Sequence, residues 1–332
     1  MKPLIRPDEI RLQIEGAALS GRGDLFLSCS NAEARFEGFA RLCQYRPGND
    51  PLWRYVDLPT TVADATFFSS RTGETDATAA ASFVFLTEEG DVMYLPTGHE
   101  AVTERITGAG LWSDDSEGWG SMIALTQIGE RLYACGGGGQ IYRRAKPGVW
   151  EHIDTGLLRN KGDKKSISFK AIAGPNEQEI YVGGWHQNVN DGVLYCGDGR
   201  RQWKPVANDI RAVSSIHVER DDSIWACGRG GTVLHGNHVD GFKDVSEIDD
   251  TRSYVDIACY DGQVFLATET GLYLHANGKT RPIRTGLDPD HTDGHILRVA
   301  NGMLWSIGYV DILRFDGTSW ERIEFPGNPP IR

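Results

Sequence analysis

The sequence lacks the features that mark several common classes of protein. None of its six cysteines, at positions 29, 43, 135, 196, 227 and 259, forms a CxxC pair, which argues against a zinc or redox motif. The longest apolar runs, such as ASFVFL at 81–86, are strand-sized and too short to span a membrane. The opening residues, MKPLIRPDEI, contain no apolar core of signal-peptide length. We therefore expect a cytoplasmic protein whose thiols are reduced and buried.

Basic residues are also in the minority. The 332-residue chain has 34 Lys and Arg against 46 Asp and Glu, a formal net charge of −12. A surface of this sign repels nucleic acid and suits a basic protein or a cation as partner. The hydrophobic content of 40% is that of a globular protein with a sizeable core.

No segment shows a sustained apolar period near 3.6 residues, so helices should be scarce. A strand pattern recurs instead. LYACGGGGQIYRR (132–144) aligns without gaps with IWACGRGGTVLHG (224–236), and related units begin near Ile180, Val264 and Leu304. The units follow one another at intervals of 48, 44, 40 and 40 residues. Four short strands within about 40 residues are typical of a propeller blade.

Two further units fill the N-terminal third of the chain. The sequence therefore predicts an all-β fold, a single β-propeller domain over 1–332 with seven four-stranded blades; six and eight blades are the alternatives. The expected blades span 11–58, 62–107, 118–154, 167–206, 209–247, 252–285 and 293–325. Because the last unit ends on its outer strand near Ile323, we expect the ring to close by packing between the first and last blades rather than by a swapped strand.

The four consecutive glycines, Gly136 to Gly139, suggest either a phosphate-binding loop or a hairpin. A phosphate loop needs Lys and Ser or Thr after the last glycine and then a helix, whereas Gln140 and Ile141 continue here as a strand. We predict a tight hairpin whose residues adopt positive φ, which glycine does without steric cost.

The turns YRPGNDPLW (45–53), RRAKPGVW (143–150), YCGDGRRQW (195–203) and RFDGTSW (314–320) resemble degenerate Asp-boxes. The repeats as a whole resemble bacterial β-propellers of the WD-repeat, YVTN and Asp-box superfamilies. The resemblance is one of architecture, covers essentially the whole chain, and implies a turn between the third and fourth strands of each blade. We expect the tryptophan that ends each turn to cover the core of the neighbouring blade. These residues are Trp53, Trp150, Trp203 and Trp320.

In a propeller, the loops from the fourth strand of one blade to the first strand of the next share a face with the hairpins between the second and third strands. Such a loop face commonly carries the functional site. Three of its predicted loops are acidic and one, RNKGDKK at 159–165, is basic. The acidic residues that we interpret as partner-binding are Asp114, Asp115, Asp249, Asp250, Asp288 and Asp290. The alternative is that these charges are simply solvated.

Aromatic side chains on the same loops are candidate anchors for a partner. Trp112 and Trp119 bracket the first acidic segment, and the long hairpin 183–192 carries Trp185 and His186. The alternative is that the indoles pack on their own blades.

No motif of nucleophilic or zinc catalysis is present, and we predict no cofactor and no metal. The densest histidine and carboxylate cluster is the alternative metal site: Asp290, His291, Asp293 and His295.

We interpret the chain as a non-enzymatic protein-binding propeller. By analogy of fold, it resembles a bacterial immunity protein that neutralises a cationic toxin through an acidic loop face. The alternative is a hydrolase, a lyase or a carbohydrate-binding propeller with a site in the central funnel, assisted by a metal. An open funnel with three or more convergent His, Arg or carboxylate groups would favour the enzyme, and a plugged funnel with an aromatic and acidic rim would favour the binder. The sequence identifies neither the partner nor the oligomeric state.

Overall fold

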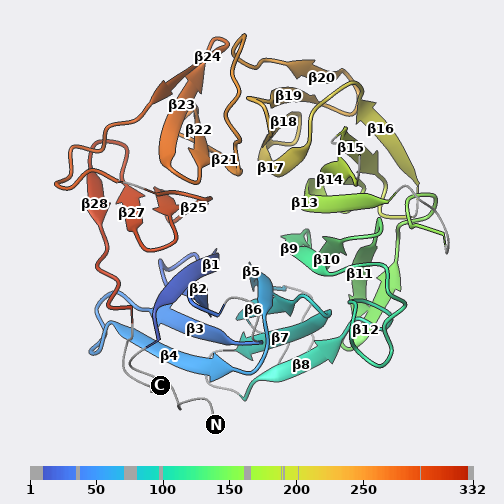
Figure 1. Ribbon diagram of the computed structural model, residues 1–332, viewed down its shortest axis with the longest axis horizontal. Helices are drawn as coiled ribbons and strands as arrows, with labels where there is room; N and C mark the ends of the chain where they lie inside the picture. Colours follow the sequence, from blue (N-terminus) through green and yellow to red (C-terminus); the bar gives the residue numbers. More distant parts are fainter. Residues whose placement is uncertain are drawn as a thin grey trace.

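The computed structural model describes residues 10–34, 38–70, 81–96, 100–160, 166–187, 189, 191–200, 202–291 and 293–327. In these ranges the regular structure consists of β-strands, which form seven four-stranded antiparallel sheets around a central axis (Figure 1). The prediction of an all-β propeller with seven blades is confirmed, and the six- and eight-bladed alternatives are excluded. Within the described ranges, no helix is long and apolar enough to cross a membrane.

The strands of each blade follow one another in chain order from the inner to the outer edge. Blade 1 holds β1 (Leu12–Leu19), β2 (Leu25–Asn31), β3 (Ala40–Tyr45) and β4 (Trp53–Leu58); blade 2 holds β5 (Val62–Phe68), β6 (Ser82–Thr87), β7 (Asp91–Pro96) and β8 (Val102–Arg105); blade 3 holds β9 (Met122–Ile128), β10 (Arg131–Gly136), β11 (Ile141–Lys146) and β12 (Val149–His152); blade 4 holds β13 (Ile167–Asn176), β14 (Glu179–His186), β15 (Gly192–Gly197) and β16 (Trp203–Ala207). Blade 5 holds β17 (Val213–Arg220), β18 (Ser223–Gly228), β19 (Val233–Asn237) and β20 (Gly241–Asp244); blade 6 holds β21 (Asp256–Tyr260), β22 (Gln263–Thr268), β23 (Gly271–Ala276) and β24 (Lys279–Pro282); blade 7 holds β25 (Ile296–Ala300), β26 (Met303–Ile307), β27 (Ile312–Phe315) and β28 (Trp320–Arg322).

The hydrophobic core is divided among the junctions between blades. Seven apolar clusters each combine side chains from two neighbouring sheets, and together they complete the ring. Because both faces of a blade are covered in this way, all six residues of β6 are buried. In the outer strand β4, the first four residues alternate between buried and exposed positions. Continuous apolar runs therefore mark second strands, whereas the outer strands are largely accessible.

The four turn tryptophans lie at these junctions. The indole N–H groups of three of them donate to the preceding blade or its exit loop: Trp53 to the Glu324 carbonyl at 2.9 Å, Trp150 to the Glu104 carboxylate at 3.0 Å and Trp203 to the Ile153 carbonyl at 2.5 Å. Trp320 packs in the cluster between blades 6 and 7. The prediction that these side chains cover the neighbouring core is confirmed.

The ring closes between blades 7 and 1. Ile14 from blade 1 shares a cluster with Ile296 and Ile323 from blade 7 and its exit. The Ile14 N–H also donates to the Tyr309 carbonyl at 2.8 Å. In the described residues each sheet contains strands of one repeat alone, so closure rests on packing, as predicted.

The glycine-rich segment is the hairpin between β10 and β11. Gly138 and Gly139 have φ values of 70° and 83°, the left-handed region that favours glycine. A Cβ added to Gly138 would meet the Trp119 carbonyl oxygen at 2.6 Å, which shows how closely the β8–β9 loop approaches this hairpin. The glycines therefore serve a turn and a close backbone approach, as predicted.

Candidate partner-binding face

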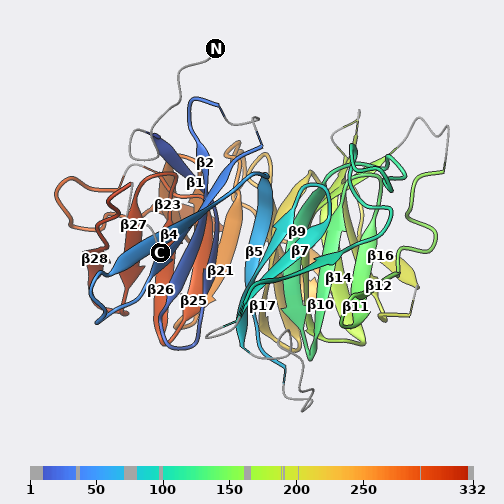
Figure 2. The same ribbon diagram turned by 90° about the horizontal axis from the view of Figure 1, so that it is seen from below.

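The loops that leave each fourth strand and the hairpins between second and third strands lie on one face of the ring. Figure 2 shows the blades from the side, with the β8–β9 loop rising at the upper edge. We call this the loop face. Five of the exposed large apolar side chains lie on it: Leu111, Trp112, Val189, Ile248 and Val310. An exposed group of this kind on otherwise polar loops is typical of an interaction surface.

The β8–β9 loop presents Trp112, whose side chain is 85% exposed. Glu89, in the neighbouring β6–β7 hairpin, holds the loop from below. Its carboxylate accepts hydrogen bonds from the Trp112 N–H at 2.9 Å and the Ser113 N–H at 2.8 Å. Although partial burial opposes ionisation, these donors lower the pKa of Glu89. The exposed indole therefore sits on a fixed backbone rather than on a free loop.

The two predicted partner-binding acids of this loop have different surroundings. Asp115 accepts from the Arg105 guanidinium, at 2.6 Å from Nη2, and from the Gly108 N–H at 3.2 Å. These bonds, of which the one to Arg105 is strongest, lower the pKa of Asp115. Asp114 is exposed. Asp114 is thus available to a partner, whereas Asp115 shapes the loop.

Trp119, the second indole of this loop, is half-buried. Its ring lies edge-on to His152 at the end of β12, with 5.3 Å between ring centroids. The nearby Arg159 donates to the Gly118 carbonyl at 3.0 Å and so ties the next loop to this one. The rest of the predicted basic segment, 161–165, lies outside the described residues.

Trp185 and His186 were expected at the exposed tip of the 183–192 hairpin, but they lie at the end of β14, where the hairpin begins. Trp185 pairs with Ser168 and with Gly192 in the sheet. Its ring carries the Arg229 guanidinium at 5.2 Å from the centroid. The sequence could not show this contact, because Arg229 belongs to the next blade.

The two predicted partner-binding acids of the β20–β21 loop also differ in exposure. Asp249 is exposed, with a φ of 64°. The Asp250 side chain is only 2% exposed, and it accepts from Arg252 at 3.0 Å and from the Tyr254 hydroxyl at 2.5 Å. Among the large apolar side chains of the described residues, Ile248 in this loop has the highest exposed fraction, 88%. The sequence did not point to it, because an isoleucine in a loop carries no motif.

In the β24–β25 loop, Asp288 is exposed and Asp290 is engaged. Asp290 accepts from Thr285 Oγ1, from the Thr285 N–H at 3.1 Å and from the His291 N–H at 3.0 Å. The hydroxyl bond is the strongest cause of the lowered pKa of Asp290. Its carboxylate therefore organises the loop.

The alternative metal residues do not converge. His291 uses Nε2 to accept the Leu272 N–H at 3.0 Å, and Asp293 accepts the Val310 N–H at 3.1 Å. The His295 ring stacks on Tyr309 at 4.2 Å. Over the part of the chain that the structure describes, no group of three or more His, Cys, Asp or Glu side chains could hold a metal ion.

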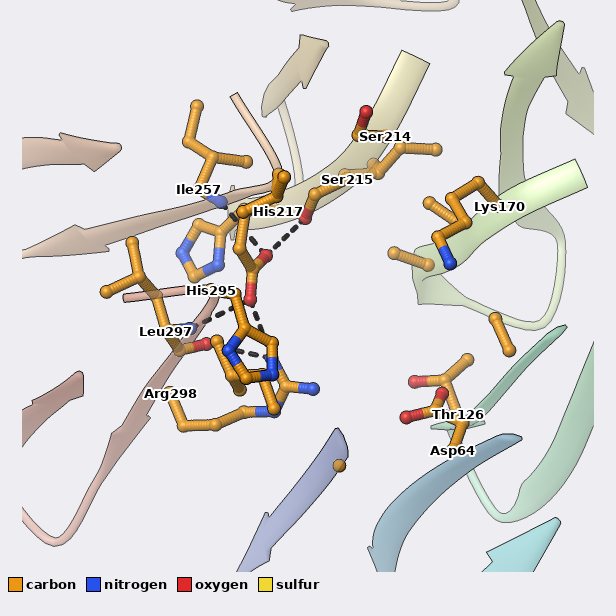
Figure 3. A pocket seen from close by; sticks show the side chains of 18 of the residues that line it. Asp64, Thr126, Lys170, Ser214, Ser215, His217, Ile257, His295, Leu297 and Arg298 are labelled. Atoms are coloured by element: carbon orange, nitrogen blue, oxygen red, sulfur yellow. Dashed lines mark hydrogen bonds and ion pairs between the residues drawn. The ribbon is translucent and has the colours of Figure 1, made fainter. Parts of the chain in front are cut away.

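A cavity of about 660 Å³ lies at the centre of the ring, lined by residues of all seven inner strands. Figure 3 shows Lys170 and Asp64 on one side of it and His217, His295 and Arg298 on the other. The funnel is thus open and polar. By the criterion set out from the sequence, this geometry favours the enzyme alternative.

Two of the four carboxylates that line the cavity, however, join neighbouring blades. Asp64 on β5 accepts from the Leu125 N–H of β9 at 2.8 Å, and Asp256 on β21 accepts from the Leu297 N–H of β25 at 2.8 Å. Asp256 also binds Arg298 at 3.0 Å. Burial lowers the pKa of His217 and so disfavours its cationic form. These contacts give Asp64, Asp256 and Arg298 a structural role.

Comparisons with known proteins bear on the choice between the two functions. No family model matches the chain. The sequence is 30% identical over 270 residues to immune protein Tsi7 of Pseudomonas aeruginosa, a match that covers 80% of this chain and 81% of Tsi7.

Solved structures show the same architecture. YCF48 from Cyanidioschyzon merolae matches with a TM-score of 0.62 and 14% identity, over 95% of this chain and 96% of YCF48. A chain of the mitotic checkpoint complex matches with a TM-score of 0.58 and 12% identity, over 94% of this chain and 87% of that chain. At such identities the likeness shows the propeller fold alone.

Proposed function

Since the chain belongs to the family of immune protein Tsi7, we propose that it is an immunity protein that binds and neutralises a protein toxin. The observation that carries this proposal is sequence identity spread over four-fifths of both chains. In this function the propeller is a preformed binding surface and needs no chemistry of its own.

The loop face supports the proposal as the binding surface. Trp112 and Ile248 are protruding apolar side chains of the kind that anchor protein interfaces. Exposed carboxylates flank them at Asp114, Asp249 and Asp288. Together with the net charge of −12, these acids favour a cationic toxin, because complementary charge speeds association and selects the partner.

Co-expression tests the proposal. Candidate toxins are the products of the neighbouring genes, each expressed in a susceptible bacterium with and without this chain. We expect one of them to arrest growth alone and to be neutralised by, and bind directly to, this protein. Toxicity of every candidate in the presence of the chain, together with no direct binding, would contradict the proposal.

The acidic loop face is tested by the double variant Asp114→Lys with Asp288→Lys. Asp249 is left unchanged because its positive φ makes substitution strained. The matched control is Asp221→Lys with Asp222→Lys, which makes the same charge change in the exposed β17–β18 hairpin on the opposite face. We expect the first pair to weaken toxin binding at least about tenfold and the control to leave binding unchanged.

A small-molecule function in the central cavity is the second candidate, favoured by its open, polar lining. Under that function, His217→Gln would abolish protection of the bacterium against the toxin, and the Asp114→Lys with Asp288→Lys variant would leave this protection intact. The two candidates therefore predict opposite results from the same pair of variants.

A further inference from the structure

A second cavity, of about 560 Å³, opens on the loop face between blades 4, 5 and 6. Its lining contains three cations, Lys170, Arg229 and Arg252, but one carboxylate, Glu269. We call it the basic pocket. The net charge of its lining is positive, whereas the chain as a whole and the acidic loops around the pocket are negative.

Aromatic rings hold two of the cations in place. The Arg229 guanidinium lies over Trp185 at 5.2 Å and the Arg252 guanidinium over Tyr273 at 4.8 Å from the ring centroid. Arg252 also donates to the Tyr254 hydroxyl at 3.1 Å. Stacked guanidinium groups keep their edges, with their N–H donors, directed away from the ring. The pocket is therefore built before any partner arrives.

The positive charge of the pocket is only partly balanced from within. Asp250 offsets Arg252, and Tyr254, whose pKa is raised to about 12 mainly by burial, stays neutral and donates to Asp250. Lys170 is exposed and makes no ion pair with any residue that the structure describes. Lys170 also faces the central cavity, where its charge partly offsets the effect of burial on the pKa of Asp64, so its ammonium group acts on that carboxylate without pairing with it directly.

The position of the pocket shows what a partner must bring to it. It lies between Trp185 and the loop that carries Ile248 and Asp249, so a toxin covering both would also cover the pocket. Burying a cation without a counter-charge costs free energy, and a carboxylate with two oxygens matches the guanidinium fork. We propose that the basic pocket receives the carboxylate of an Asp or Glu side chain of the toxin. This inference rests on the proposed function and adds that the toxin surface carries an acidic residue within a basic surround.

The test measures toxin affinity for Arg229→Gln and Lys170→Gln, with Arg220→Gln as the matched control. Arg220 lies in the same blade as Arg229, at the end of β17 on the opposite face, with its side chain 66% exposed. We expect at least a tenfold weaker Kd for each pocket variant, partial recovery in Arg229→Lys, and no change for the control. Unchanged thermal unfolding of the variants would show that folding is not the cause.

A double-mutant cycle then identifies the acid. Replacing each toxin Asp or Glu by its amide should reveal one position whose effect disappears in Arg229→Gln. If the unmodified protein binds and neutralises the toxin but the pocket variants bind equally well, or no toxin carboxylate couples to Arg229, the inference is overturned and the proposed function stands. Failure of the unmodified protein to bind any candidate overturns both.

Discussion

Trp112 protrudes from a turn whose backbone is bound by the Glu89 carboxylate. Its backbone and that of Ser113 are fixed by Glu89, so placing the indole in a partner's pocket costs little additional ordering. Exposed aromatic side chains on fixed backbone are the residues that most often dominate binding energy. Trp112 is therefore the strongest anchor candidate on the loop face.

We expect Trp112→Ala to weaken toxin binding by about 2 kcal/mol, roughly thirtyfold in Kd, mainly through faster dissociation. Stability should change by no more than about 0.5 kcal/mol, because the side chain packs on little in the free protein. Val239→Ala, in the exposed β19–β20 turn on the opposite face, is the control and should change neither quantity. An equal Kd for the toxin, measured by calorimetry for Trp112→Ala and the unmodified protein, would show that Trp112 is not in the interface.

The stabilising contribution of Glu89 to this loop should depend on pH. Its pKa is lowered in the folded protein, so its stabilising effect is fully present above its ordinary pKa of 4.5 and is lost as the pH falls through the lowered value. Glu89→Gln should cost about 1–2 kcal/mol at neutral pH. The difference in free energy of unfolding between the two proteins should shrink as the pH falls from about 5 to 3. A difference that stays constant in urea unfolding over that range would show that the carboxylate charge is not the cause.

The sequence predicted which loops would be acidic, but it could not show which of their acids face solvent and which bind groups within the fold. Asp114, Asp249 and Asp288 are exposed. Asp115 is exposed as well but pairs with Arg105, and Asp250 is buried against Arg252 and Tyr254. The difference is made by Arg105, Arg252 and Tyr254, whose distance from these acids depends on how the loops bend. Exposure of a single charge was therefore beyond the reach of spacing and composition.

At the scale of the element, strands were predictable and contacts between blades were not. Strand boundaries follow from apolar runs and from glycines at the turns, both of which are local. The buried ion pair between Glu104 on β8 and Arg144 on β11 joins blades 2 and 3, with side chains 4% and 6% exposed. Nothing in the repeat pattern indicates it, because the two partners belong to different repeats, and each repeat unit shows only its own strands.

Because the Arg144–Glu104 pair is buried, truncation of Arg144 alone should strongly reduce the free energy of unfolding. Arg144→Ala leaves the Glu104 carboxylate buried, with the Tyr94 hydroxyl and the Trp150 indole as its remaining donors. We expect a loss of about 3–5 kcal/mol in the free energy of unfolding, measured with guanidinium chloride. A loss below about 1 kcal/mol would mean that the carboxylate is protonated or solvated after the change.

Two controls separate burial from charge. Arg314→Ala removes another ion pair between a third and a fourth strand, at 2.7 Å from Glu321 but within one blade. Because Glu321 is 58% exposed, the loss in the free energy of unfolding should stay below about 1 kcal/mol. Replacing both members, as Arg144→Met with Glu104→Leu, should cost less than Arg144→Ala because no charge is left without its partner.

On the scale of the whole molecule, the ring must hold its first and last blades together without a shared strand. The contacts that do so lie near the C-terminal end of the described chain: Ile323 in the closing cluster, the Glu324 carbonyl bound by Trp53, and Phe325 at 5.0 Å from the Trp53 ring. Chain order predicted this mode of closure, since both ends of the repeat array are complete blades.

Ending the chain at Arg322 should therefore destabilise the whole propeller. We expect a loss of at least about 3 kcal/mol, because a buried isoleucine and an aromatic contact are removed together and leave a cavity. A chain ending at Gly327 keeps all three closing contacts and is the control. Equal midpoints of guanidinium unfolding for the two chains would show that the ring does not depend on this segment.

The charge of the whole face and the anchor within it should act on different rate constants. Long-range attraction by the acidic loops raises the association rate and is screened by salt, with a Debye length of about 10 Å at 0.1 M. Association of the unmodified protein with its toxin should slow steeply between about 0.02 and 0.5 M NaCl. The Asp114→Lys and Asp288→Lys double variant should associate more slowly and with a weaker salt dependence, whereas Trp112→Ala should keep the salt dependence and dissociate faster. An association rate of the unmodified protein that does not change with salt would argue against a cationic toxin and leave the apolar anchors as the basis of recognition.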